Sequence, residues 1–120
     1  MNTRKIGDFY EREAVRYLEK QGYRIEQRNF RCRCGEIDYI AIAPDHETLV
    51  YGEIKYRSTG CCGNGLEAVD YRKQRRISRA ALVHYQNHGM DKGRKVRFDV
   101  IAIDGKGRIQ LVQNAFDFVE

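Results

Sequence analysis

The stretch GEIDYIAIAPDHETLVYGEIKY, residues 35–56, decides the fold of this chain. Two runs rich in Ile, Tyr and Val flank Pro44-Asp45-His46-Glu47, which has the composition of a turn. The pattern predicts an antiparallel hairpin of strands 36–43 and 48–56. If Ala43 faces Thr48 across the turn, residues opposite each other have numbers that sum to 91.

That register sets Asp38 opposite Glu53 and Glu36 opposite Lys55, and all four side chains then project from one face of the sheet. Two facing carboxylates in a half-buried place repel each other unless a cation lies between them. Mg²⁺ prefers oxygen ligands and uses one or two carboxylates together with water and phosphate. We therefore predict a metal site, with Lys55 beside it. The alternative is an edge hairpin with solvated acids and a weak Glu36–Lys55 surface pair.

Working outward from the hairpin, the rest of the chain alternates between helical and strand patterns. A helix is expected up to Gly22, a glycine cap, and a second helix follows a Gly- and Cys-rich loop at 57–65. The predicted helices are 3–21 and 66–88, and the other strands are 23–30, 96–103 and 108–113. This order predicts an α/β fold with a mixed sheet, in which the long second helix forms the crossover.

The composition favours one globular domain, residues 1–120, with a basic surface. Lys and Arg number 22 against 17 Asp and Glu, which gives a net charge of +5 and favours polyanionic partners. The N-terminus shows no apolar leader, and no run approaches the roughly 18 apolar residues of a membrane span. We therefore expect a cytoplasmic protein with no membrane partner.

Each predicted helix carries one charged residue toward the centre of its apolar stripe. On the first helix it is Glu13, and on the second it is Lys73. A charge in such a place needs a partner, so both residues are candidates for a polar site inside the core. The alternatives are that Glu13 pairs with a backbone group or an arginine, and that the lysine extends its amine to the solvent.

The opposite face of the second helix is strongly basic. Four arginines lie there without intervening acids: Arg72, Arg75, Arg76 and Arg79. Such a face is ordinarily a solvated surface, but this one also has the composition of a phosphate-binding track. We predict that it contacts nucleic acid.

The runs Gly35-Glu36-Ile37-Asp38 and Glu53-Ile54-Lys55 together resemble the PD-(D/E)XK nuclease pattern. The wider set resembles the uncharacterised bacterial YraN-type family, relatives of the archaeal Holliday-junction resolvases. Its other matching pieces are Gly7, Glu13-Ala14, Leu18, Gly22-Tyr23, Arg28-Asn29, Arg31, Arg57, Gly60, Val69, Lys73, Ala80-Ala81 and Arg97-Phe98-Asp99-Val100. The chain departs from the pattern where Ile37 replaces a proline and where Gly52 replaces a bulky apolar residue.

The resemblance implies a restriction-endonuclease-like fold with an αβββαβ core and a metal-dependent endonuclease that hydrolyses DNA phosphodiester bonds. Asp38 and Glu53 look like the metal-binding acids, Lys55 like the catalytic lysine, and Glu13 like a helix-one acid that completes the metal shell. Mg²⁺ or Mn²⁺ would be held by the acids and the carbonyl of Ile54. The residues expected to grip the DNA backbone are Arg28, Arg31, Arg57, Arg72, Lys73, Arg75, Arg76 and Arg79.

Branched or junction DNA is the expected substrate. Because such junctions are two-fold symmetric, a homodimer is a further expectation.

Two competing interpretations stay open at this point. One is a non-catalytic nucleic-acid-binding protein that keeps the nuclease fold, which would bind DNA without cleaving it. The other is a domain stabilised by Zn²⁺, because the predicted hairpin brings together its two cysteine-bearing ends. The four candidate zinc ligands are Cys32, Cys34, Cys61 and Cys62, although their spacing matches no common zinc motif and free thiols are favoured.

Overall fold

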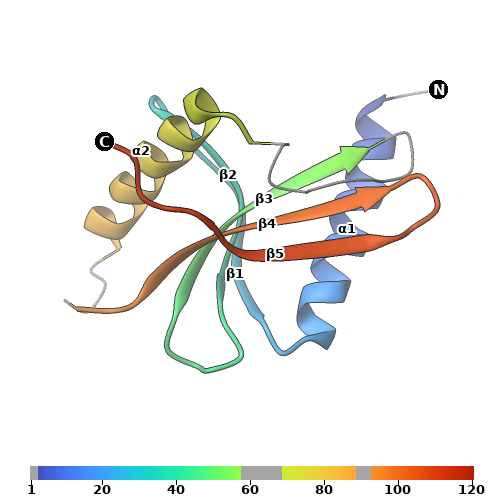
Figure 1. The fold of residues 1–120 in the computed structure, drawn as a ribbon, viewed down its shortest axis with the longest axis horizontal. Coiled ribbons are helices and arrows are strands. Elements are labelled where there is room, and N and C mark those ends of the chain that lie inside the picture. Colours follow the sequence, from blue (N-terminus) through green and yellow to red (C-terminus); the bar gives the residue numbers. More distant parts are fainter. Residues whose placement is uncertain (1–2, 58–68, 89–92) are drawn as a thin grey trace.

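A mixed five-stranded sheet separates two helices, one on each of its faces (Figure 1). The computed structural model describes residues 3–57, 69–88 and 93–120, apart from the side chains of residues 3–6 and 57. The strands lie in chain order across the sheet: β1 (Arg24–Cys32), β2 (Gly35–Ile42), β3 (Leu49–Arg57), β4 (Val96–Asp104) and β5 (Ile109–Phe116). The helices are α1 (Thr3–Lys20) and α2 (Tyr71–Asn87).

The predicted register of the central hairpin is confirmed near the turn, but the ladder ends before the predicted pairs Asp38–Glu53 and Glu36–Lys55. Strands β2 and β3 are antiparallel, and their pairs run from Ile42–Leu49 to Tyr39–Gly52, so each pair sums to 91. Beyond Gly52, β3 leaves β2 and continues beside β4, with which it is parallel along its whole length. The two parallel strands are joined by the crossover connection expected of the α/β fold, and this connection contains α2.

Each face of the sheet has its own apolar core. On the α2 face, Ile77 and Ala80 pack against β2 and β3, and on the α1 face Ala14 and Leu18 do the same. Because side chains alternate along a strand, Leu49 and Tyr51 of β3 face α2, while Val50 faces α1. The two helices therefore cannot both reach a group on one face of β3.

The start of α2 differs from the prediction. Val69 and Asp70 are not helical, and Asp70 is the N-cap residue: its carboxylate accepts a hydrogen bond of 2.8 Å from the backbone amide of Lys73. The predicted start at Leu66 is wrong. The apolar pattern continues to the buried Val69, which precedes the first helical residue, and this made the helix seem longer at its N-terminus. The rest of the predicted loop and helix start, residues 58–68, lies outside the described residues.

The other bounds agree with the prediction to within a few residues. Helix α1 ends at Lys20, and Gly22 has the positive φ of +98° expected of a glycine cap. Strand β5 runs on to Phe116, past its predicted end. Neither α1 nor α2 is long and apolar enough to cross a membrane.

Gly52 is required by the aromatic ring that lies across it. Tyr39 is its antiparallel partner and is fully buried, and a Cβ built on Gly52 would overlap the Tyr39 ring. The Tyr39 hydroxyl is buried and has no hydrogen-bond partner among the described residues.

We predict that Gly52→Ala lowers the free energy of unfolding by about 2 kcal/mol or more, because the new methyl group collides with the Tyr39 ring. Urea denaturation followed by circular dichroism measures this loss. A second substitution, Tyr39→Leu, should restore part of it by vacating the space.

Tyr39→Phe alone is the control, because it removes only an unpartnered hydroxyl and should leave stability unchanged or slightly higher. If Gly52→Ala proves as stable as the parent protein, the close packing of these two residues is contradicted.

Candidate active site

Two carboxylates meet where β2 and β3 separate. Glu53 follows Gly52 on β3 and is buried, with 4% of its surface exposed. Asp38 precedes Tyr39 on β2 and is half-buried, and its Oδ2 accepts a hydrogen bond of 2.7 Å from the backbone amide of Ile54. The Asp38 side chain therefore replaces a backbone partner that β3 has lost, and this brings it beside Glu53.

The closeness of the two acids affects the pKa of Asp38. Burial, and to a smaller degree the negative charge of Glu53, raise the pKa of Asp38 to about 7, although the hydrogen bond from the Ile54 amide lowers it. A cation beside the two carboxylates would therefore favour the ionised form of Asp38.

Helix α2 supplies one such cation. The Nζ of Lys73 lies 3.0 Å from Oε1 of Glu53, in a buried ion pair whose lysine end reaches the solvent. Burial lowers the pKa of Lys73, but the hydrogen bond and charge of Glu53 outweigh this, so that the pKa is raised overall. The sequence indicated that Lys73 points inward, and the structure identifies Glu53 as its partner.

A second amine lies along the same strand. Lys55 follows Glu53 by two residues, so alternation places it on the same face of the sheet, and it is half-buried. No carboxylate of the described residues forms an ion pair with its amine. The site thus combines two acids and two lysines, from β2, β3 and α2.

The predicted Glu36–Lys55 pair is not formed. The β2–β3 ladder ends at Tyr39–Gly52, so Glu36 has no partner on β3. It is exposed instead, and Oε2 of its carboxylate lies 3.6 Å from Nε of Arg31 on the neighbouring strand β1. The reason is the divergence of β3 from β2, which the continuous register did not anticipate.

Glu13 is not brought to the acid pair. It lies on α1, whose core residue Ala14 packs on the face opposite to that of α2. The carboxylate of Glu13 is 35% exposed and forms a 3.4 Å ion pair with Arg16, one of the alternatives left open by the sequence. The apolar stripe of α1 is centred on Ala14 and Leu18, which leaves Glu13 at its border.

The donor set limits what the site would hold. The oxygens of Asp38 and Glu53 suit a hard divalent cation such as Mg²⁺, which completes its shell with water and substrate oxygens. Within residues 3–57, 69–88 and 93–120, no three His, Cys, Asp or Glu side chains gather so as to hold a metal ion. Any ion here would therefore take two carboxylates from the chain and keep several other positions open.

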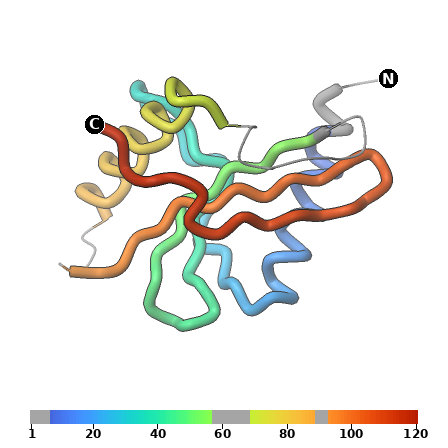
Figure 2. Tube along the Cα trace, in the orientation of Figure 1, coloured from blue at the N-terminus to red at the C-terminus, as the bar shows by residue number. Residues whose placement is uncertain are grey.

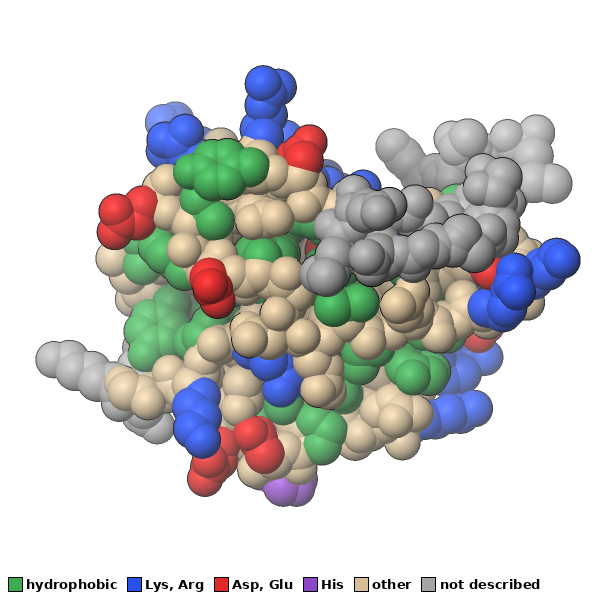
Figure 3. Space-filling model, in the orientation of Figure 1, with side chains coloured by type: hydrophobic (Ala, Val, Ile, Leu, Met, Phe, Trp, Pro, Cys, Tyr) green, Lys and Arg blue, Asp and Glu red, His purple; other side chains and the backbone are tan. Residues whose placement is uncertain are grey.

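The arginines of α2 line its exposed surface. Arg72, Arg75, Arg76 and Arg79 are all exposed, and Lys and Arg side chains stand out over α2 at the upper left of Figure 3. Two other candidates are engaged: Arg28 bonds Glu11 at 2.9 Å, and Arg31 approaches Glu36. The side chain of Arg57 lies outside the described part of the chain.

The cysteines give the zinc hypothesis no test. Cys32 is half-buried against the α2-face core, and Cys34 is exposed; both are free thiols. Cys61 and Cys62 lie outside the described residues. The four-thiolate site therefore stays a prediction.

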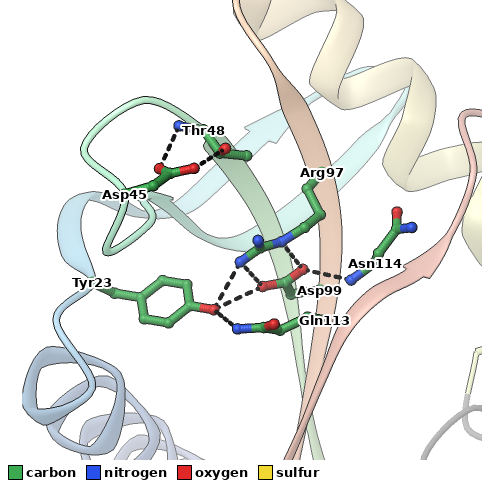
Figure 4. A network of polar contacts seen from close by, with 7 residues as sticks. All are labelled: Tyr23, Asp45, Thr48, Arg97, Asp99, Gln113 and Asn114. Atoms are coloured by element: carbon green, nitrogen blue, oxygen red, sulfur yellow. Dashed lines mark hydrogen bonds and ion pairs between the residues drawn. The ribbon is translucent and has the colours of Figure 1, made fainter.

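A second polar cluster lies on the α1 face (Figure 4). Asp99 of β4 is fully buried and accepts hydrogen bonds of 2.8 and 3.0 Å from the guanidinium of Arg97. The hydroxyl of Tyr23 accepts from Arg97 and from Gln113, each at 2.8 Å. The charges of Arg97 and Asp99 neutralise each other, and the cluster joins β4, β5 and the start of β1. We therefore infer that it stabilises the fold and is not a binding site. Alternating polar residues in the apolar strand 96–104 were its signal in the sequence.

The sheet order, the two flanking helices and the acid pair define an α/β protein with a restriction-endonuclease-like core. The model of the uncharacterised protein family UPF0102 matches residues 10–103, and the chain belongs to this family. This confirms the resemblance to an uncharacterised bacterial family of the YraN type.

Similar curated proteins carry the same family name. A UPF0102 protein of Myxococcus xanthus is 39% identical over 95% of this chain and 90% of its own length. One of Alkaliphilus oremlandii is 44% identical over 95% and 99%, and one of Lachnoclostridium phytofermentans is 41% identical over 98% and 97%.

We predict that Asp38→Asn stabilises the protein at about pH 8 in the absence of divalent cations, by up to about 4 kcal/mol. An unfolded aspartate ionises near 3.8 but folded Asp38 only near about 7, so ionisation costs the folded state free energy as pH rises between these values. The amide keeps an oxygen for the Ile54 backbone. The gain should therefore shrink toward zero as the pH falls to about 4.

Urea denaturation across this pH range measures the effect, and Glu36→Gln, an exposed acid on the same strand, is the matched control. A variant that is less stable than the parent at about pH 8, or whose gain grows on acidification, would contradict the strained acid pair.

Proposed function

We propose that this protein is a divalent-metal-dependent endonuclease that hydrolyses phosphodiester bonds in DNA. The observation that carries the proposal is the pair of the half-buried Asp38 and the buried Glu53, with Lys73 bound to Glu53 and Lys55 next along the strand face. A pair of acids that is costly to desolvate is typical of a site built for a cation, and a cation beside lysines suits a phosphate.

Mg²⁺ or Mn²⁺ would be held by the carboxylates of Asp38 and Glu53, with the carbonyl of Ile54 as a third oxygen. When bound, such an ion neutralises charge that develops on the phosphate oxygens and acidifies a coordinated water. Since Glu13 lies on the other face of the sheet, it takes no part in this set. The remaining ligand positions would be filled by water and by the substrate.

The two lysines would take different parts. Lys73 already neutralises Glu53, so it holds the acid pair together before a metal and substrate arrive. Lys55 has no acid partner among the described residues, so its amine is available to position the attacking water or to stabilise the charged phosphate.

The exposed arginines of α2 would guide the DNA backbone toward the acids. Lys73 belongs to the same helix but points inward to Glu53, while Arg75 and Arg79 are exposed. One helix therefore joins the basic surface to the acid pair, and a phosphate chain that follows the arginines is led to the site. Branched or junction DNA is the proposed substrate, a homodimer the proposed assembly, and the cytoplasm the proposed location.

We expect the purified protein to cut branched, flapped or linear DNA with Mg²⁺ or Mn²⁺, and Glu53→Gln, Asp38→Asn and Lys55→Met each to reduce the rate at least about 100-fold. Gel analysis of end-labelled substrates measures cleavage. Glu36→Gln serves as the matched acid control and should retain the parent rate, because Glu36 is exposed and bound to Arg31.

Undiminished cleavage by Glu53→Gln would sink the assignment of the site. DNA binding with no cleavage by the parent protein would favour the non-catalytic alternative.

We also predict that replacing Arg75 and Arg79 together by Gln reduces the salt dependence of DNA binding. Each lost phosphate contact lowers the slope of log affinity against log salt concentration by about 0.9, so the pair should lower it by up to about 2. The matched control is the double replacement of Arg16 and Arg24, which are similarly exposed on other elements. An unchanged slope in the Arg75/Arg79 variant would remove α2 from the DNA-binding surface.

A further inference from the structure

Three aromatic rings gather at the end of β3, away from both apolar cores. Tyr10 of α1 stacks on Tyr56 of β3, with ring centroids 4.3 Å apart and planes inclined by 28°. Phe9 meets the edge of Tyr10 at 5.2 Å. We call these three residues the aromatic platform; none of them belongs to either core cluster.

Two of the three rings of the platform are open to solvent, and Tyr10 between them is half-buried. Phe9 is 54% exposed and Tyr56 is 43% exposed, whereas Tyr39 and Tyr51 are almost completely buried. Single exposed aromatic residues are common on protein surfaces, but here Tyr10 lies between the two more exposed rings and contacts both, so that Phe9 and Tyr56 present aromatic surface side by side on two elements. The neighbouring Tyr56 hydroxyl raises the pKa of Tyr10, as does burial, which agrees with the close approach of the two rings.

A turn with a net positive charge lies beside the platform, while the exposed Asp8 of α1 precedes Phe9. In the register of β3 with β4, the last residue of β3 lies opposite Asp104. The β4–β5 turn, which follows Asp104, is therefore beside the end of β3 (Figure 2). Asp104 is the acid of this turn, and it is neutralised by Arg108 at 2.7 Å and by two backbone amides. Lys106, in the same turn, is exposed and adds a positive charge.

The platform also lies next to the proposed active site along the chain. Tyr56 directly follows Lys55 and comes three residues after Glu53, a rise of about 10 Å along the strand. Its ring faces the α1 side, while Glu53 faces α2, so a ligand that reaches both must pass over the end of the sheet. A flexible single strand can make this turn, whereas a stiff duplex cannot.

We propose that the aromatic platform stacks on an unpaired base of single-stranded DNA. Flat aromatic surfaces beside positive charges are the means by which proteins hold single strands without reading their sequence. The inference rests on the DNA contact of the proposed function but not on cleavage, and it narrows the substrate to DNA that offers unpaired nucleotides near the cut.

The test is binding without divalent metal, so that cleavage plays no part. Three fluorescein-labelled probes of equal length are compared by anisotropy: oligodeoxyadenylate, a strand of abasic residues, and a blunt duplex. The parent protein should bind oligodeoxyadenylate more tightly than the abasic strand, which carries the same phosphates but no bases. Tyr56→Leu and Phe9→Leu should each weaken oligodeoxyadenylate binding about 10-fold and leave abasic-strand binding unchanged.

Two variants separate stacking from loss of structure. Tyr56→Phe keeps the ring and should retain tight binding, and Phe118→Ala removes an equally exposed ring elsewhere and should change nothing. The chain has no tryptophan, so Tyr56→Trp introduces a single one, whose fluorescence oligodeoxyadenylate should quench and the abasic strand should not.

The outcomes distinguish this inference from the proposed function. Equal affinity of the parent protein for the natural and abasic strands, with no quenching, overturns the platform and leaves the nuclease proposal standing. Failure to bind any of the three probes overturns both. If oligodeoxyadenylate quenches the introduced tryptophan but the parent protein does not cleave DNA, the result supports the platform and not the nuclease proposal.

Discussion

The desolvated carboxylates of Asp38 and Glu53 are the interaction on which the rest of the site depends. Neither acid would be stable there alone: Asp38 accepts the amide that β3 exposes as it leaves β2, and Glu53 is paired with Lys73 of α2. An electrostatic cost persists, because burial and then the negative charge of Glu53 raise the pKa of Asp38. The simplest use of two carboxylates held together at this cost is to bind a cation.

Much of the sheet follows from local sequence. The turn at Pro44–Glu47 and the alternation of apolar residues set the hairpin register, and a slip by one residue would have exposed the core face. The same register places Tyr39 opposite Gly52, so their close packing was implicit in the sequence. The point at which β3 leaves β2 was not, because it depends on the pairing of β3 with β4, which is distant in the chain.

The site was predictable in part. Alternation placed Asp38, Glu53 and Lys55 on a common face, because this needs only the strand period. Helical periodicity showed that Lys73 points inward, but it could not identify Glu53 as its partner. For Glu13 the same reasoning failed: a helical wheel says which side of a helix is apolar, but not which face of the sheet that side covers.

The most direct test of the acid pair is a crystal structure of the protein soaked with Mn²⁺, using the anomalous scattering of the metal. We predict an anomalous peak between the carboxylates of Asp38 and Glu53, with Lys73 moved away from Glu53 or sharing it with the ion. Mn²⁺ bound elsewhere in the crystal while Asp38 and Glu53 stay as they are here would contradict the account, as would the two side chains pointing to opposite faces of the sheet.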